Sequence, residues 1–269
     1  MKRTEKSTKR IVLAFLAGCL ALTLAAAPVP AEEADTPTAS ADLGVFSKYV
    51  WRGYELSDDG IVIQPSITVG YKGVSVNLWG NLDTNASGDD GDDETQFNET
   101  DLTLSYEKSF GMVTTGVGYC YYALDGTKDS QELFASIGLD VFLAPTLTVY
   151  REISYLPGWY FTFGLSHSFE LHEGITLDLS GSIGYMISDD DEVAEVDDEL
   201  NPTSEKYSGF HDGNLSVGLT VPLGEYWTVS PMIAYSFPLT DDADKLIEAT
   251  SISGDSDFLY GGVTFSFAF

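Results

Sequence analysis

The chain has 269 residues and a formal net charge of −29, with 42 Asp and Glu residues against 13 Lys and Arg. This negative charge excludes a nucleic-acid partner, because binding to phosphates requires a positively charged surface. Aromatic residues make up 13% of the chain, which excludes a disordered acidic protein, since such proteins contain few aromatic residues.

Residues 1–31 have the pattern of a secretory signal peptide. Five Lys and Arg residues precede an apolar run over Ile11–Ala27, and the small residues Val29–Ala31 follow as a cleavage site. A lipoprotein-type cleavage site, Leu16–Cys19, is the alternative. It would leave too few apolar residues before it, because such leaders contain roughly 7–15. We therefore expect removal of residues 1–31, after which the net charge is −33.

The processed chain has no stretch of about 18 consecutive apolar residues, which excludes a transmembrane helix. An exported chain rich in aromatic residues can still cross a membrane as a closed barrel of strands. Cys120 is the only cysteine after the leader, so no intrachain disulfide forms. Its position in a strand-like run indicates packing rather than chemistry.

Twelve segments after the leader alternate between apolar and polar residues with the period of two that is typical of β-strands. In the segment that begins at Asn98, for example, Leu102 and Leu104 share one face, and Asp101 and Thr103 share the other. The predicted strands are residues 43–54, 61–71, 74–82, 98–109, 113–122, 131–142, 146–154, 159–169, 175–187, 214–223, 227–239 and 257–269.

The connections between these segments alternate between short and long. Lys72–Gly73 is a two-residue turn, whereas the longest connection is Ser188–Gly213. Outer-membrane barrels have the same asymmetry, with short periplasmic turns, long extracellular loops and an even number of strands. The chain also ends on Phe269, at the end of an aromatic strand, like the closing strands of these barrels.

The predicted fold class is therefore all-β: a closed, antiparallel, up-and-down transmembrane β-barrel of about 12 strands in the bacterial outer membrane. The barrel is expected over residues 43–269, and residues 32–42 form a short periplasmic segment. Pro65 and Pro231 lie inside predicted strands, where each removes a ladder hydrogen bond. A bulge at each proline would accommodate this loss.

Aromatic residues at the strand ends sort into two girdles, as expected from their preference for the headgroup region. One girdle lies at the rim with short turns and the other at the rim with long loops. The first is predicted to contain Tyr71, Phe169, Trp227 and Phe269, and the second Tyr121, Trp159, Tyr185 and Phe237.

Alternation along the strands also predicts which charged residues face the lumen. The predicted pore-lining residues are Glu99, Asp101, Glu107, Glu132, Asp140 and Asp178, with the bases Lys48 and Arg52. Because rings of acids select cations, we expect a channel for small hydrophilic solutes or ions that favours cations, in which Arg52 pairs with carboxylates. The alternative is that these charges form a salt-bridged plug. The number of strands does not decide between these two alternatives, because barrels of about 8 strands are filled by side chains and barrels of about 16 strands enclose an open channel.

The acidic loop segments Asp89–Glu94, Asp189–Glu192 and Asp197–Glu199 suggest a second function, a surface barrel that binds divalent cations or partners. They lack the ligand spacing of an EF-hand, so a solvated loop is the simpler interpretation and no metal site is assigned. An enzyme is not expected, because His167 alternates with Ser166 and Ser168 and so points away from them. We expect outer-membrane lipid as the surrounding partner, and neither a cofactor nor a catalytic residue.

Several segments resemble the TorF family of putative porins. The resemblance lies in Ser47–Gly53, with the run Tyr-Val-Trp-Arg-Gly, in Gln64–Tyr71 and in Val76–Asn81. Thr146–Tyr150, Gly164–Phe169 and the strand ending at Phe269 are similar in order and spacing. The resemblance implies an outer-membrane barrel of Gram-negative bacteria that acts as a channel, and it implies no substrate or catalytic residues.

Overall fold

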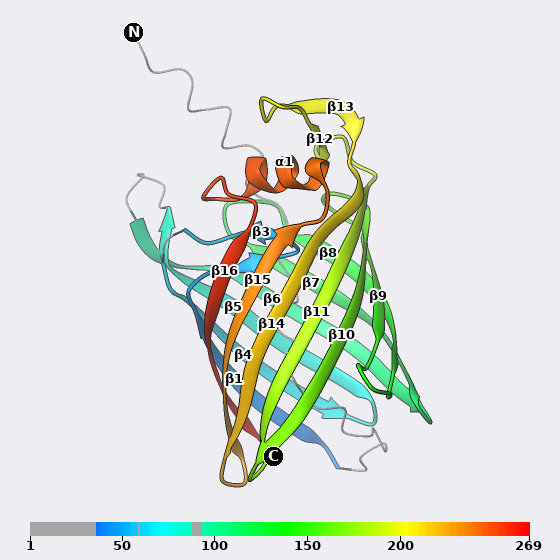
Figure 1. Ribbon diagram of the computed structural model, residues 1–269, viewed down its shortest axis with the longest axis vertical. Helices are drawn as coiled ribbons and strands as arrows, with labels where there is room; N and C mark the ends of the chain where they lie inside the picture. The colour runs from blue at the N-terminus through cyan, green and yellow to red at the C-terminus, as the bar shows by residue number, and fades with distance from the viewer. Residues whose placement is uncertain (1–35, 59, 88–92) are drawn as a thin grey trace.

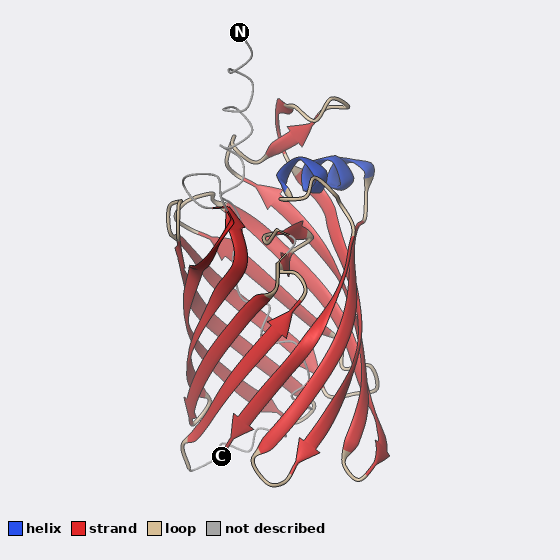
Figure 2. Ribbon diagram, turned by 90° about the vertical axis from the view of Figure 1, so that its left-hand side faces the viewer, coloured by secondary structure: helices blue, strands red, loops and turns tan. Residues whose placement is uncertain are grey.

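The structure is a computed structural model that describes residues 36–58, 60–87 and 93–269. Within these ranges, twelve strands form a closed barrel (Figures 1 and 2) in the order β1-β16-β15-β14-β11-β10-β9-β8-β7-β6-β5-β4. The first and last strands close it, with antiparallel pairs from Ser40–Ala268 to Phe46–Gly262. The predicted closed antiparallel barrel of 12 strands is confirmed.

The barrel strands match most of the segments with period-two alternation. Their bounds are β1 Thr38–Phe46, β4 Val62–Tyr71, β5 Val74–Ser87, β6 Asp93–Phe110, β7 Val113–Leu124, β8 Ser130–Leu139, β9 Thr146–Glu152, β10 Gly158–His172, β11 Ile175–Ser188, β14 Ser208–Leu223, β15 Trp227–Pro238 and β16 Phe258–Ala268. Five short elements lie between them, which are β2 Val50–Trp51, β3 Tyr54–Glu55, β12 Ala194–Val196, β13 Pro202–Lys206 and α1 Asp241–Thr250.

The two ends of the barrel differ. One end, here called the turn end, carries the short connections and the C-terminus, and the other, the loop end, carries α1 and the β12–β13 pair (Figures 1 and 2). At the turn end Lys72 and Gly73 have φ values of 50° and 80°, which is the geometry of a tight two-residue hairpin. No helix in the described part of the chain is long and apolar enough to cross a membrane.

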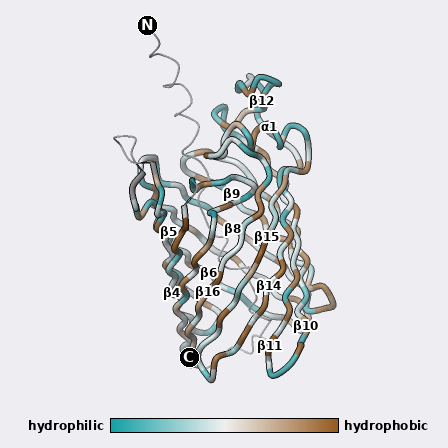
Figure 3. Tube along the Cα trace, turned by 60° about the vertical axis from the view of Figure 1, so that its left-hand side comes forward, coloured by the Kyte–Doolittle hydropathy of each residue, from teal (hydrophilic) through white to brown (hydrophobic). Residues whose placement is uncertain are grey.

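Most apolar side chains of the strands point outward and most polar ones inward, except at the loop end, where wall residues such as Val62, Trp79 and Met186 join an apolar cluster inside the barrel. On β6, Leu102 and Leu104 are 46% and 50% exposed, whereas Asp101 and Thr103 are 1% and 2% exposed. The alternation of hydropathy follows the strands around the barrel (Figure 3). This exposed apolar outer face is the arrangement of a barrel with lipid outside.

Aromatic rings lie on the outer surface near the strand ends. At the turn end Trp227 and Phe269 are 55% and 71% exposed, and the Trp227 ring packs 4.9 Å from that of Phe267. At the loop end Trp159 is 39% exposed and lies 6.2 Å from the ring of Phe161. These positions suit rings that anchor the barrel at two headgroup layers.

The first predicted strand, 43–54, is wrong. β1 begins at Thr38 and ends at Phe46, so residues 38–42 belong to the barrel wall rather than to a periplasmic segment. The chain then turns into the barrel and forms a small hairpin, β2–β3, with Val50 paired to Glu55 and Trp51 to Tyr54. We call Val50–Glu55 the inner hairpin. The sequence pattern alone could not distinguish it from a continued wall strand, because the two short strands of the inner hairpin are themselves extended.

The predicted loop between β15 and β16 contains the helix α1. Its N-cap is Thr240, whose Oγ1 accepts a hydrogen bond from the Ala243 backbone N at 3.2 Å. Acidic residues fill its first turn, where they stabilise the positive end of the helix dipole. Its buried face, which includes Leu246 and Ile247, belongs to the same apolar cluster as the inner hairpin. The helix therefore covers the loop end of the lumen.

The two strand prolines are accommodated without bulges, contrary to expectation. On either side of Pro65, the pairs Ile63–Leu82 and Ser66–Trp79 keep one register between β4 and β5. Pro65 has no paired residue on β5, but it still pairs with Leu43 of β1. Pro231 likewise lies between the β14–β15 pairs Gly218–Met232 and Val221–Val229, in one register.

The predicted signal peptide and much of the acidic run Asp89–Glu94 lie outside the described residues.

Candidate lumen site at the inner hairpin

The inner hairpin is buried within the loop-end half of the barrel. Trp51, Tyr54 and Glu55 are only 1–2% exposed. Arg52 and Gly53 form the turn, with φ values of 46° and 85°, and both lie in the left-handed region that a tight hairpin turn of this type requires. A Cβ on Gly53 would lie 2.9 Å from both Asp212 Cβ and Ile247 Cδ1. Only glycine therefore fits between the barrel wall and α1.

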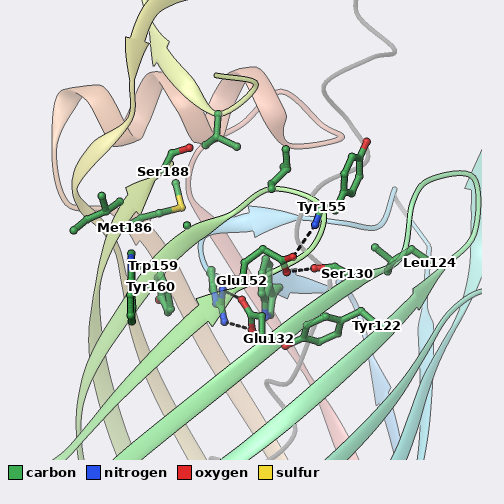
Figure 4. Close-up of a pocket in the computed structure, with 16 residues that line it drawn as sticks. Tyr122, Leu124, Ser130, Glu132, Glu152, Tyr155, Trp159, Tyr160, Met186 and Ser188 are labelled. Atoms are coloured by element: carbon green, nitrogen blue, oxygen red, sulfur yellow. Dashed lines mark hydrogen bonds and ion pairs between the residues drawn. The ribbon is translucent and has the colours of Figure 1, made fainter. Parts of the chain in front are cut away.

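Arg52 forms a bidentate ion pair with Glu132 of β8. The guanidinium Nη1 and Nη2 donate to the two carboxylate oxygens at 2.7 and 2.8 Å. The Tyr122 hydroxyl of β7 donates to Glu132 Oε2 at 2.7 Å, and so fixes the carboxylate (Figure 4). Arg52 and Glu132 are 8% and 3% exposed. Bidentate charge-assisted pairs of this kind are strong and geometrically specific.

Three aromatic rings surround the Arg52 guanidinium. The guanidinium carbon lies 4.2 Å from the ring centre of Trp51, 4.6 Å from that of Tyr150 and 4.3 Å from that of Tyr160. We call these three rings the aromatic cage. Burial alone would lower the pKa of Arg52, but the adjacent Glu132 carboxylate raises it above its ordinary value. The guanidinium is therefore a permanent cation, held by a carboxylate and by the faces of aromatic rings.

A β-bulge places a second carboxylate next to the aromatic cage. Between the β11–β14 pairs Ile183–Gly213 and Tyr185–Phe210, the single residue Gly184 faces both His211 and Asp212. As a result His211 and Asp212, although consecutive, are both buried, at 0% and 5% exposed. The Tyr160 hydroxyl donates to Asp212 Oδ1 at 2.9 Å. Bulges often redirect side chains in this way next to functional sites.

Substitution of Gly184 is expected to break this contact. In Gly184→Ala the new Cβ would lie 2.3 Å from Asp212 Oδ1 and 2.4 Å from the Tyr160 hydroxyl. We expect a loss of about 1–3 kcal/mol in the free energy of unfolding, as for other overpacked sites, measured by urea unfolding in lipid vesicles. Gly164→Ala on β10 is the matched control, since its Cβ would meet only Gly181 O at 3.9 Å. Equal effects of the two substitutions would contradict the prediction.

The far strand of the inner hairpin is attached to the segment after α1. The Glu55 backbone N donates to Ser251 Oγ at 3.2 Å, and its Oε2 accepts from the Ser253 backbone N at 3.2 Å. Lys48 forms an ion pair with the same carboxylate and is 24% exposed. Both ends of the inner hairpin are thus held, by Glu132 on the wall and by the segment after α1.

The structure places the eight predicted pore-lining residues in two groups. Lys48 and Arg52 belong to the loop and inner hairpin instead of a wall strand. Glu99, Asp101 and Glu132 face inward in the loop-end half and are all below 5% exposed. Of the eight, only Arg52 and Glu132 form a bidentate pair with each other.

The other three predicted residues lie nearer the turn end. Glu107 is exposed on β6, and Asp140 follows the end of β8 in an exposed turn, outside the strand that was predicted to contain it. Asp178 is half-buried on β11 and accepts hydrogen bonds from the hydroxyls of Thr176 at 2.9 Å and Thr220 at 2.7 Å. The lumen carries other paired hydroxyls here, such as Ser75 with Ser105 at 2.7 Å.

Sequence reasoning missed several residues of the site. Asp212 and His211 were expected in a loop. Their inward direction depends on the bulge, which leaves no local sequence signal. Glu152 could have been found, because it lies on the same face of its strand as Thr148 and Tyr150. Its Oε1 accepts from the backbone N atoms of Ser154 and Tyr155 at 2.7 and 2.9 Å.

A cavity of about 50 Å³ lies beside the ion pair (Figure 4). It is lined by Trp51, Arg52, Tyr122, Leu124, Ser130, Glu132, Glu152, Tyr155, Leu156, Gly158, Trp159, Tyr160, Met186, Ile187, Ser188 and Val193. This volume holds a few water molecules and is far below the several hundred Å³ of a typical ligand pocket. The inner hairpin therefore fills most of the space that a solute would need.

The histidines do not form a recognisable catalytic pair. His167 faces outward, where its ring lies 4.5 Å from those of Phe142 and Phe169. His211 Nδ1 lies 3.1 Å from the Tyr207 hydroxyl inside the barrel, and His172 is exposed beside Glu173. Among the residues that the structure describes, no group of three or more His, Cys, Asp or Glu side chains could hold a metal ion.

The chain was compared with known sequences and structures. A family described as a bacterial protein of unknown function (Gcw_chp) matches residues 30–156, which include four of the segments that resemble the TorF family. No curated protein matches the chain. The NanC porin is similar in structure, with a TM-score of 0.51 and 9% identity over 86% of this chain and 98% of that one.

An outer-membrane channel, COG4313 from Pseudomonas putida F1, is equally similar. Its TM-score is 0.51, with 11% identity over 87% of this chain and 95% of that one. At such low identity these likenesses concern the fold alone. The chain has the porin-like β-barrel fold of outer-membrane proteins.

Proposed function

We propose that the protein is an outer-membrane channel for the passive diffusion of small hydrophilic solutes, that it favours cations, and that it is not an enzyme. The observation that carries this proposal is the charge of the loop-end lumen. Its buried carboxylates are Glu55, Asp83, Glu99, Asp101, Glu132, Glu152 and Asp212, and its bases are Lys48 and Arg52. An excess of carboxylates at the narrowest part of a pore selects cations. The TorF resemblance supports the same function.

The inner hairpin is proposed to restrict this pore. It occupies the centre of the loop-end half, while the turn-end half is lined by hydroxyl groups from several strands. Solutes would therefore enter readily from the turn end and meet the restriction at Arg52. We infer that conductance is low while the inner hairpin is docked and rises when it leaves the wall.

Planar-bilayer recording under a KCl gradient tests this function. We expect a reversal potential displaced toward that of K⁺, and a smaller displacement in the double variant Glu99→Gln/Asp101→Asn, which removes two buried charges. Glu107→Gln is the matched control, since it removes an exposed carboxylate of the same strand. A preference for chloride would contradict cation selectivity. If neither the wild type nor a variant that lacks residues 50–55 shows any conductance, the proposed channel function is contradicted.

A closed surface barrel is the second candidate. The observation that favours it is the number of bonds that hold the inner hairpin in place, on the wall and at the last loop. In that case the protein would act through its acidic loops, which are proposed to bind divalent cations, with outer-membrane lipid around the barrel. The absence of conductance in both the wild type and that variant would favour this candidate over the channel.

A further inference from the structure

The barrel wall beside the inner hairpin forms a receptor for a planar cation. Glu132 presents two oxygens that match the two N–H groups of a guanidinium, at 2.7 and 2.8 Å. Tyr122 fixes that carboxylate, and the rings of Tyr150 and Tyr160 cover the guanidinium at 4.6 and 4.3 Å. A bidentate carboxylate with aromatic faces suits a guanidinium better than an ammonium, which is a compact point charge.

The receptor and its occupant belong to different parts of the fold. Tyr122, Glu132, Tyr150 and Tyr160 lie on the neighbouring barrel strands β7, β8, β9 and β10, and the closed sheet holds them in place. Arg52 instead lies in the turn between two strands of two residues each. Its φ of 46° is unfavourable for a residue with a side chain. A strained conformation of this kind persists because the surrounding contacts hold it.

The cavity beside the ion pair is so small that a solute can bind to Glu132 only in place of Arg52. The cavity of about 50 Å³ beside the ion pair is too small for an alkylguanidinium. It does extend from Glu132 to the loop residues Tyr155 and Val193, so it connects the receptor with the loop end. Removal of the Arg52 side chain would join this cavity to the empty receptor.

We propose that the wall residues Tyr122, Glu132, Tyr150 and Tyr160 form a binding site for solutes that carry a guanidinium group, and that Arg52 occupies it as an internal ligand. This rests on the proposed channel function and names its substrate class. A guanidinium solute competes with Arg52 for Glu132, binds against the rings of Tyr150 and Tyr160 and releases the inner hairpin. The rings on the wall remain to cover the solute after Trp51 has left with the hairpin.

Chemical rescue tests the site. Arg52→Gly empties the receptor and tolerates the left-handed φ. The purified barrel in detergent is titrated with ethylguanidinium and, separately, with ethylammonium at equal ionic strength, and its thermal unfolding is followed. We expect saturable stabilisation by ethylguanidinium, with an apparent affinity at least about tenfold higher than for ethylammonium. The double variant Arg52→Gly/Glu132→Gln should lose this preference.

Gly53→Ala offers a second route if Arg52→Gly does not fold. Its Cβ would press on Asp212 and Ile247, so it undocks the inner hairpin without altering the receptor. The same preference for ethylguanidinium is expected. Equal responses to the two ions, or a preference that survives Glu132→Gln, would overturn the proposal.

The two proposals fail in different ways. Channels of Arg52→Gly that conduct but are not blocked by ethylguanidinium would overturn the site and leave the channel function standing. Specific binding of ethylguanidinium without conductance in any variant would overturn the channel function and leave the binding site. Block of Arg52→Gly channels by ethylguanidinium at concentrations where ethylammonium has no effect would support both.

Discussion

Glu132→Gln is expected to release the inner hairpin from the barrel wall. The substitution leaves the Arg52 guanidinium buried without its carboxylate, and loss of one partner of a buried ion pair costs about 3–5 kcal/mol. The inner hairpin can escape this cost by moving into water, so the barrel itself should stay folded. The undocked population should rise by about 100-fold or more, since each 1.4 kcal/mol is a factor of ten.

Trypsin measures this release directly, because it cleaves after Arg52. In the wild type that bond is buried, so cleavage at Arg52–Gly53 in the folded barrel should be slow. It should become much faster in Glu132→Gln, with the cut mapped by mass spectrometry. Glu107→Gln, on an exposed carboxylate, is the control. Unchanged cleavage in Glu132→Gln would mean that apolar contacts with α1, not the ion pair, hold the inner hairpin.

Leu104→Arg is expected to impair folding of the whole barrel. Leu104 points outward from β6, is 50% exposed and has Leu102 and Tyr106 on the same face, so it lies within the lipid-facing band. An Arg at the middle of this band costs about 2–4 kcal/mol. The free energy of unfolding in urea, after refolding into lipid vesicles, should fall by that amount.

The neighbouring position provides the control for this second prediction. Ser105 lies on the lumen face, next to Ser75, where an Arg would meet water and carboxylates. Ser105→Arg should therefore unfold at nearly the same urea concentration as the wild type. If both substitutions were tolerated equally, the outer face of β6 would not be in contact with lipid.

The barrel was predictable from the sequence because its strands obey one simple rule. On β6, Asp101 and Thr103 turn inward and Leu102 and Leu104 outward, as their alternation required. A strand in a closed barrel has no freedom to depart from this period, since lipid lies on one side and water on the other. Helix α1 could also have been predicted from the sequence. Thr240 before three acidic residues, with Ala243, Leu246 and Ile247 at helical spacing, is a helix signal.

The inner hairpin was not predictable by the same rule. Val50–Glu55 shows no clear apolar and polar alternation, since Val50, Arg52 and Tyr54 share one parity, and Arg52–Gly53 is an atypical version of the two-residue turns that signal a hairpin. What places the inner hairpin is a set of distant partners, Glu132 on the wall and Ser251 beyond α1. No local pattern reports such contacts. The bulge that turns Asp212 inward has the same cause, since it depends on Gly184 in the neighbouring strand.

These distant partners also set the order in which the molecule can assemble. The inner hairpin follows the first strand, yet its contacts lie 80 residues away at Glu132 and 196 residues away at Ser251. Contacts of such long range form late, because the intervening chain must first be ordered. Docking of the inner hairpin would thus be a late step of folding, which waits until β8 and the segment beyond α1 are in place.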